Sequence, residues 1–253
     1  MNLFLKLYNR IKKFKNFLKQ WVYLAKSSSV AEKYSQEVYY AECFRSAISG
    51  SPWLLRQSFM PGGWALDFSG LYLLYRILER MRPSKIVEFG IGESTKIFSQ
   101  YADHYQETSF FTFEHDQQWM DFFQRSFPLN GKNCVIIERP LETISFHNTK
   151  TLRYSGNIGD YTGENIEFIF LDGPYGADGT YARTQVLDLI PNFLNKEKFC
   201  IVIDDYNRVG EKNTAKVLLE KLAAAGIAYR TRTYFSLREI LIIVSADQRF
   251  LVS

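Results

Sequence analysis

Short apolar segments alternate with helical stretches over most of the chain, and this alternation limits the possible folds more than any other feature. The predicted strands are residues 85–89, 109–114, 134–138, 168–171 and 199–203. The predicted helices between them are residues 94–101, 117–127 and 183–193. Repeated strand–helix units form parallel sheets that are covered by helices on both faces. The sequence therefore predicts an α/β fold with a doubly wound, mostly parallel sheet.

The C-terminal part departs from this alternation. A helix is predicted over residues 214–225, and strands are predicted over residues 228–234 and 239–244. The link between the two strands is so short that it permits only antiparallel pairing. We therefore expect a seven-stranded, Rossmann-like sheet that ends in an antiparallel strand pair.

An N-terminal helical extension precedes the first predicted strand. Apolar residues recur every three or four positions in residues 1–26, a segment that holds seven Lys or Arg and no acid. Residues 31–48 and 66–81 are predicted as two further helices. We therefore divide the chain into a basic amphipathic helix (1–26), a helical lid or cap (27–82) and an α/β domain (83–253).

Two functions fit the basic helix. Aromatic residues with lysines around them are typical of a helix that lies on an anionic membrane surface. The same spacing forms a short coiled-coil seam, either in a homodimer or against another domain. No apolar run reaches the roughly 20 residues that span a bilayer, and no cleavable signal sequence is present. We therefore expect a cytoplasmic protein, soluble or peripheral on the inner face of the membrane.

Charge argues against nucleic acid as a partner. The formal net charge is +4, and the first 26 residues alone contribute seven basic side chains. The remainder of the chain is therefore close to neutral, whereas a nucleic-acid-binding protein needs a basic face over much of its surface.

A turn with two glycines follows the first predicted strand. Gly90 and Gly92 lie where the backbone must turn tightly and approach a ligand without a β-carbon. The amides of the following helix, which include those of Ser94 and Thr95, would favour an anionic group, either a pyrophosphate or an amino-acid carboxylate. A plain strand-to-helix turn without a ligand is the alternative.

An acid ends the second predicted strand. Glu114 lies about 20 residues beyond the glycines, where a carboxylate accepts two hydrogen bonds from ribose hydroxyls. His115 follows it directly and would approach the adenine side. A surface acid at a strand end is the alternative, but the glycines in register favour ribose binding.

Two buried strands end abruptly in carboxylates. Asp172 follows one strand, and Asp204 and Asp205 follow the next one along the chain. Adjacent strands lie about 4.8 Å apart and ligands bind beyond their carboxyl ends, so the three side chains could converge. Converging carboxylates need protons or a cation, and an all-oxygen set suits Mg²⁺, Mn²⁺ or Ca²⁺. We therefore predict a divalent-metal site, with caps of the following turns as the alternative.

The segment 142–165 is predicted as a long loop before the fourth strand. Loops of this length are often functional lids. His147 lies within it and is a candidate general base near neutral pH. A solvated or hydrogen-bonded loop histidine is the alternative.

Together these features resemble a class I S-adenosylmethionine-dependent methyltransferase. The resemblance covers residues 83–245 and rests on the pattern Glu88-x-Gly90-x-Gly92, the acid after the second strand and the terminal antiparallel pair. It implies that Glu88 lies near the cofactor's amino group and that Glu114 binds its ribose. The two glycines would lie under the methionine part. The third glycine of dinucleotide-binding dehydrogenases is absent.

The strand-end acids resemble those of the metal-dependent catechol and caffeoyl-coenzyme A O-methyltransferases. In that family, acids after the fourth strand and an Asp-Asn pair after the fifth hold the metal. Asp172, Asp204 and Asp205 fall on these positions, with Asp205 in place of the Asn. The lysine base of that family is missing, because residues 173–176 read Gly-Pro-Tyr-Gly. The resemblance implies metal help from all three acids, with Asp172 also beside the cofactor.

Short motifs also resemble the glucuronoxylan 4-O-methyltransferase type. These are an Asp-Gly-Pro-x-Gly turn over 172–176, an arginine further on and an Asp-x-x-Arg-x-x-Glu stretch over 205–211. The resemblance implies a sugar hydroxyl as acceptor, on a glycan, a glycolipid or a sugar acid. Arg183 and Arg208 would pair with a substrate carboxylate, and Tyr175 would stack on a sugar ring. Structural salt bridges are the alternative for both arginines.

These observations predict an S-adenosylmethionine-dependent O-methyltransferase that acts on a carbohydrate hydroxyl with the help of Mg²⁺ or Mn²⁺. A metal-independent methyltransferase of small molecules is one alternative. A scaffold of the same fold that binds a membrane or a partner protein is another. A scaffold has no need to concentrate acids at one sheet edge, which argues against it.

Overall fold

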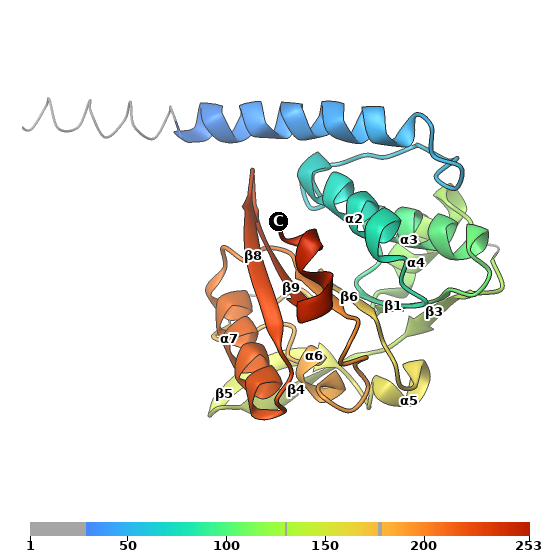
Figure 1. Cartoon of the computed structure of the whole chain (residues 1–253). Helices are drawn as coiled ribbons and strands as arrows, with labels where there is room; N and C mark the ends of the chain where they lie inside the picture. The colour runs from blue at the N-terminus through green and yellow to red at the C-terminus, as the bar shows by residue number, and fades with distance from the viewer. Residues whose placement is uncertain (1–28, 130, 177–178) are drawn as a thin grey trace, which may run out of the picture.

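The computed structural model describes residues 29–129, 131–176 and 179–253 (Figure 1). The predicted basic helix over residues 1–26 lies outside this part of the chain. Residues 29–48 form a helix, which confirms the helix predicted over 31–48. Among the described residues, no helix combines the length and the apolarity needed to cross a bilayer.

A seven-stranded sheet forms the centre of the molecule. Its strands are β1 (Lys85–Phe89), β2 (Ser109–Glu114), β3 (Cys134–Glu138), β6 (Phe168–Leu171), β7 (Cys200–Ile203), β8 (Tyr229–Phe235) and β9 (Glu239–Ser245). The strand order is β3-β2-β1-β6-β7-β9-β8. The strands from β3 to β7 run parallel, whereas β9 is antiparallel to both β7 and β8. The predicted seven-stranded sheet and its antiparallel end are confirmed.

Helices cover both faces of the sheet (Figure 1). They are α2 (Phe68–Met81), α3 (Glu93–His104), α4 (Gln117–Ser126), α5 (Gly159–Thr162), α6 (Val186–Leu189), α7 (Val209–Ala224) and the 3₁₀ helix η1 (Ala246–Leu251). Successive side chains of a strand point to opposite faces. Accordingly Ile86 packs in the core formed with α2 and α3, while its neighbour Val87 packs in the core formed with α7.

The segment predicted as a lid or cap, residues 27–82, contributes to the first of these cores. Phe44, Trp53 and Leu66 are buried with the strand residues Ile86 and Phe168. Trp53 stacks on Tyr75 at a ring separation of 5.1 Å. The loop between the two helices of this segment is the part that reaches the candidate site.

The predicted loop over 142–165 is wrong in its first half, which forms an antiparallel hairpin. Its strands are β4 (Leu141–Phe146) and β5 (Thr149–Tyr154), joined by His147 and Asn148. Both turn residues have positive φ, at 48° and 60°, as a two-residue type I′ turn requires. The glycine that usually follows Asn in such a turn is missing, so the sequence carries no strong turn signal.

Two predicted helices also change length. The helix predicted over 183–193 is reduced to α6 because Arg183 has a left-handed φ of 57° and Pro191 cannot continue a helix. The helix predicted over 214–225 begins earlier, at Val209. Its first turn therefore lies next to the strand-end aspartates.

Candidate functional site

The glycine turn joins β1 to α3 and forms one wall of the site. Gly90 has a φ of +96°, and a β-carbon there would lie 3.1 Å from the backbone nitrogen of Gly173. Both observations require glycine at this position. A β-carbon at Gly92 would meet no atom within 4 Å, so this residue faces open space.

Glu88 holds the turn from beneath. Its buried carboxylate accepts hydrogen bonds from the hydroxyls of Ser94 (2.5 Å) and Thr95 (2.6 Å), and Thr95 Oγ1 accepts one from the Gly92 amide. A large cavity lies beside this turn, and none of Glu88, Ser94 and Thr95 is among the described residues that line it. The Glu88 carboxylate is thus already bonded within the turn. Its contact with the cofactor, and those of the Ser94 and Thr95 amides, stay predictions.

Replacing Glu88 by Gln should make stability less dependent on pH. Burial raises the pKa of Glu88 to about 7, from the ordinary value of 4.5 for an exposed glutamate. The protonated Glu88 carboxyl therefore adds to the free energy of unfolding. This stabilisation is complete below pH 4.5 and is lost as the pH rises through 7. Between pH 5 and pH 8 the wild type should lose about 2 kcal/mol more unfolding free energy than the variant. Urea denaturation measures this, and equal losses would contradict the prediction.

Glu114 connects the turn after β1 to the turn after β2. One carboxylate oxygen accepts a hydrogen bond from the Ile91 amide (3.1 Å), and the other accepts bonds from the amides of His115 (2.7 Å) and Asp116 (3.1 Å). The Nδ1 atom of His115 lies 2.7 Å from the same oxygen. Both Glu114 and His115 line the cavity. The carboxylate is thus held in one orientation at the edge predicted for ribose.

The large cavity runs along the carboxyl ends of the parallel strands. Its volume is about 630 Å³, within the range of small-molecule sites. One end is polar and includes Asp172 and Asp205, while the other is lined by Trp119, Phe122 and Phe123 of α4. The sequence analysis missed these aromatic residues, because their spacing on α4 is also that of a core-facing helix side.

The three strand-end aspartates converge as predicted. Carboxylate oxygens of Asp172, Asp204 and Asp205 all lie within 4.8 Å of one another. Burial and the neighbouring Asp204 raise the pKa of Asp172 well above its ordinary range, although Arg183 opposes this shift. Asp204 is fully buried, and its Oδ1 atom has no hydrogen-bond partner among the described residues.

Arg183 is the buried counterion of this acid cluster. Its Nη2 atom lies 3.4 Å from Asp172 and 3.1 Å from Asp205, and its Nη1 atom donates to two backbone carbonyls. Only 3% of the side chain is exposed. Because its two Nη groups already bond acids and carbonyls of the protein, these contacts favour the structural alternative for Arg183 over binding of a substrate carboxylate.

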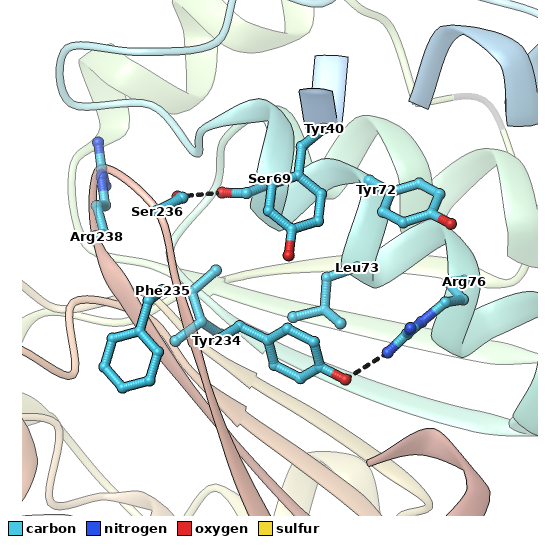
Figure 2. Close-up of a pocket in the computed structure, with 10 residues that line it drawn as sticks. Tyr40, Ser69, Tyr72, Leu73, Arg76, Tyr234, Phe235, Ser236 and Arg238 are labelled. Atoms are coloured by element: carbon cyan, nitrogen blue, oxygen red, sulfur yellow. Dashed lines mark hydrogen bonds between the residues drawn. The ribbon is translucent and has the colours of Figure 1, made fainter. Parts of the chain in front are cut away.

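Arg238 is a second counterion, which the sequence analysis did not identify. It lies in the turn between β8 and β9, with its Nη1 atom 3.2 Å from Asp204 and its Nε atom 3.3 Å from Asp67. A hydrogen bond of 2.6 Å between Ser69 and Ser236 ties this turn to α2 (Figure 2). Figure 2 also shows the small cavity that Tyr40, Arg238 and the other labelled side chains line.

Exposed aromatic residues and one arginine lie at the polar mouth of the cavity. Tyr175 is 54% exposed and Trp64 is 84% exposed, and their rings lie 5.8 Å apart. The guanidinium of Arg208 lies 6.0 Å from the Tyr175 ring and 2.9 Å from Asp205. Arg208 and Tyr175 both line the cavity, and their contacts with a substrate stay predictions.

His147 does not take part in this site. It occupies the turn between β4 and β5, and its ring stacks on Tyr181 at 5.3 Å. It is not among the described residues that line the cavity. The candidate general base thus lies outside the described cavity lining, and its role stays a prediction.

Neither protein-family models nor curated protein sequences match the chain. Among solved structures, it is 14% identical to an O-methyltransferase from Bacillus cereus, over 81% of this chain and 90% of that one, with a TM-score of 0.47. A Podospora anserina methyltransferase is 14% identical, over 82% and 88% of the two chains, with a TM-score of 0.41. A precorrin-6y C5,15-methyltransferase from Geobacter metallireducens is 14% identical, over 68% and 86%, with a TM-score of 0.44.

The sheet itself identifies the architecture. Parallel strands in the order β3-β2-β1-β6-β7 are followed by an antiparallel β9 inserted between β7 and β8. The chain has a methyltransferase fold. Sequence identities this low assign no role to a single residue, so the roles of the site residues follow from their own geometry.

Proposed function

We propose that the chain is an S-adenosylmethionine-dependent O-methyltransferase. The observation that carries this proposal is that the glycine turn, Glu114 and the aspartate Asp172 open into one cavity. A nucleoside bound at Glu114 and a polar acceptor bound at the aspartates would therefore lie next to each other. Holding two reactants in contact is a large part of what a transferase must do.

The charge around the glycine turn favours S-adenosylmethionine over a dinucleotide. Glu93, Glu114 and Asp172 all line this part of the cavity. Lys96 pairs with Glu93 at 2.7 Å, and Arg183 lies 3.4 Å from Asp172, so Glu114 is the acid of this group without a salt bridge to a Lys or Arg of the described chain. Its carboxylate would repel a pyrophosphate, whereas it attracts the sulfonium and ammonium groups of S-adenosylmethionine.

The acid cluster fits a divalent cation such as Mg²⁺ or Mn²⁺, held by Asp172, Asp204 and Asp205. The unpartnered oxygen of Asp204 supports this fit. The three aspartates belong to a larger ion-pair network of five acids and three arginines. Its acids are Asp67, Asp172, Asp204, Asp205 and Glu211, and its arginines are Arg183, Arg208 and Arg238. Acids thus outnumber arginines. When bound, such an ion lowers the pKa of an acceptor hydroxyl.

We further propose a carbohydrate-type acceptor at the polar mouth. Trp64 and Tyr175 offer exposed aromatic faces on which a sugar ring can stack. Arg208 beside them can pair with a carboxylate of a sugar acid. Asp172 lies between this mouth and the glycine turn, so an acceptor hydroxyl there would face the cofactor's methyl group.

Titration calorimetry with S-adenosylhomocysteine tests the proposed cofactor. We expect micromolar binding to the wild-type protein. If S-adenosylhomocysteine does not bind, with or without Mg²⁺, the methyltransferase proposal is wrong and the scaffold alternative takes its place.

Replacing Asp172 by Asn should weaken Mn²⁺ binding at least about tenfold, because the affinity of an oxygen-donor site depends on its number of charged ligands. Titration of Mn²⁺ into both proteins measures this change. Asp188→Asn is the matched control, since Asp188 pairs with Arg153 at 2.6 Å and does not line the cavity. A wild-type protein that neither binds Mn²⁺ nor loses activity with a chelator would favour the metal-independent alternative.

A further inference from the structure

Tyr154 ends β5 and has a buried hydroxyl that lines the cavity. Its side chain has no exposed surface, and its ring stacks on Phe89 at 6.0 Å and contacts Phe113 at 6.5 Å. The hydroxyl oxygen has no hydrogen-bond partner among the described residues. The inserted hairpin thus brings an unpaired donor into the centre of the site.

The hydroxyl lies where the turns after β1 and β6 meet. A β-carbon at Gly173 would be 2.7 Å from this oxygen and 2.9 Å from the Cα atom of Gly90. β1 and β6 are neighbours in the sheet, and the strand order reverses direction between them. In open α/β sheets this switch point is where ligands bind. Tyr154 therefore reaches the predicted position of the cofactor from below.

The chemistry of the group favours a donor. Burial raises the pKa of Tyr154 well above its ordinary value, and the acids Glu114 and Asp172 raise it further. The phenol therefore stays protonated at neutral pH. A buried hydroxyl without a partner is unfavourable, so a ligand that supplies an acceptor gains from pairing with it.

We propose that Tyr154 binds the cofactor by donating a hydrogen bond to one of its oxygen atoms at the junction of the two glycine turns. This inference rests on the proposed function, since the acceptor belongs to S-adenosylmethionine or its product. It also explains why Phe89 and Phe113 pack on the ring: they fix the direction of the hydroxyl. Gly90 and Gly173 then leave the space that the hydroxyl and the ligand share.

The Tyr154→Phe variant tests the proposal through two measurements, the Tm of the ligand-free protein and the Kd for S-adenosylhomocysteine. Loss of a structural role would lower the Tm, whereas loss of a binding role would raise the Kd alone. Removing an unpaired buried hydroxyl should leave the Tm of the ligand-free protein unchanged or raise it. The Kd for S-adenosylhomocysteine should increase about tenfold. Tyr161→Phe is the matched control, because Tyr161 lies in the same insertion but does not line the cavity.

The outcomes test the proposed function and the role of Tyr154 separately. A wild-type protein that does not bind S-adenosylhomocysteine overturns the proposed function, and the role of Tyr154 with it. A Tyr154→Phe variant with wild-type affinity overturns the role of Tyr154 alone, as does a fall in Tm that accompanies the loss of affinity. Titration with 5′-methylthioadenosine, which lacks the amino-acid part, locates the acceptor: a retained Tyr154 effect places it on the nucleoside.

Discussion

Replacing Glu114 by Ala should lower the affinity for S-adenosylhomocysteine at least about 100-fold in titration calorimetry. The carboxylate would accept two hydrogen bonds from the ribose, and hydrogen bonds to a charged group contribute about 1.5–3 kcal/mol each. Only 5% of Glu114 is exposed, so little water competes for it. Its contacts with three backbone amides also keep it in place before the ligand arrives.

The control for this variant is Glu138→Ala. Glu138 lies opposite Glu114 in the register of β2 and β3, but its side chain is exposed and does not line the cavity. The Glu138→Ala variant should bind S-adenosylhomocysteine with the affinity of the wild type. Glu114→Gln separates charge from shape, and we expect intermediate affinity because one amide oxygen can still accept a bond. Wild-type affinity in Glu114→Ala would contradict the ribose assignment.

The strands of the sheet could be predicted closely because each is a short apolar run that ends at a polar residue or a turn. Every residue of β6 and β7 is buried, so both strands are continuously apolar runs. Such runs do not have the pattern of an amphipathic helix. The hairpin of β4 and β5 could not be predicted, because its alternation is weak and its turn lacks glycine. The tertiary structure decides its conformation: Tyr154 packs against Phe89 and Phe113 of the central sheet.

The candidate site was predictable where it depends on sheet topology alone. Strand ends bring Asp172, Asp204 and Asp205 together, whatever the loops do. Counterions depend on the loops, and Arg238 comes from a turn far along the chain. Tyr154 comes from an insertion that no periodicity places near the glycine turn. The sequence therefore predicts which acids converge and leaves open what neutralises them and what lies beneath the ligand.

Replacing Arg183 by Met should lower the free energy of unfolding by about 3–5 kcal/mol, because it leaves buried carboxylates without their counterion. The guanidinium contacts Asp172, Asp205 and, at 3.6 Å from its Nε atom, the buried Glu211. Met fills a similar volume, so the change tests charge rather than packing. Urea denaturation at pH 8 measures the loss.

The pH dependence of this loss identifies its origin. Asp172 and Glu211 have pKa values raised mainly by burial and lowered in part by Arg183, so removing the guanidinium raises these pKa values further. Protonated acids need no counterion, and the deficit of Arg183→Met should therefore shrink as the pH falls from 8 to 5. Arg153→Met is the matched control: Arg153 also bridges two acids, Glu142 and Asp188, but these are 39% and 40% exposed. Its loss should not exceed about 1 kcal/mol. A deficit of Arg183→Met that stayed constant between pH 5 and pH 8 would mean that packing or backbone geometry, and not charge, makes Arg183 necessary.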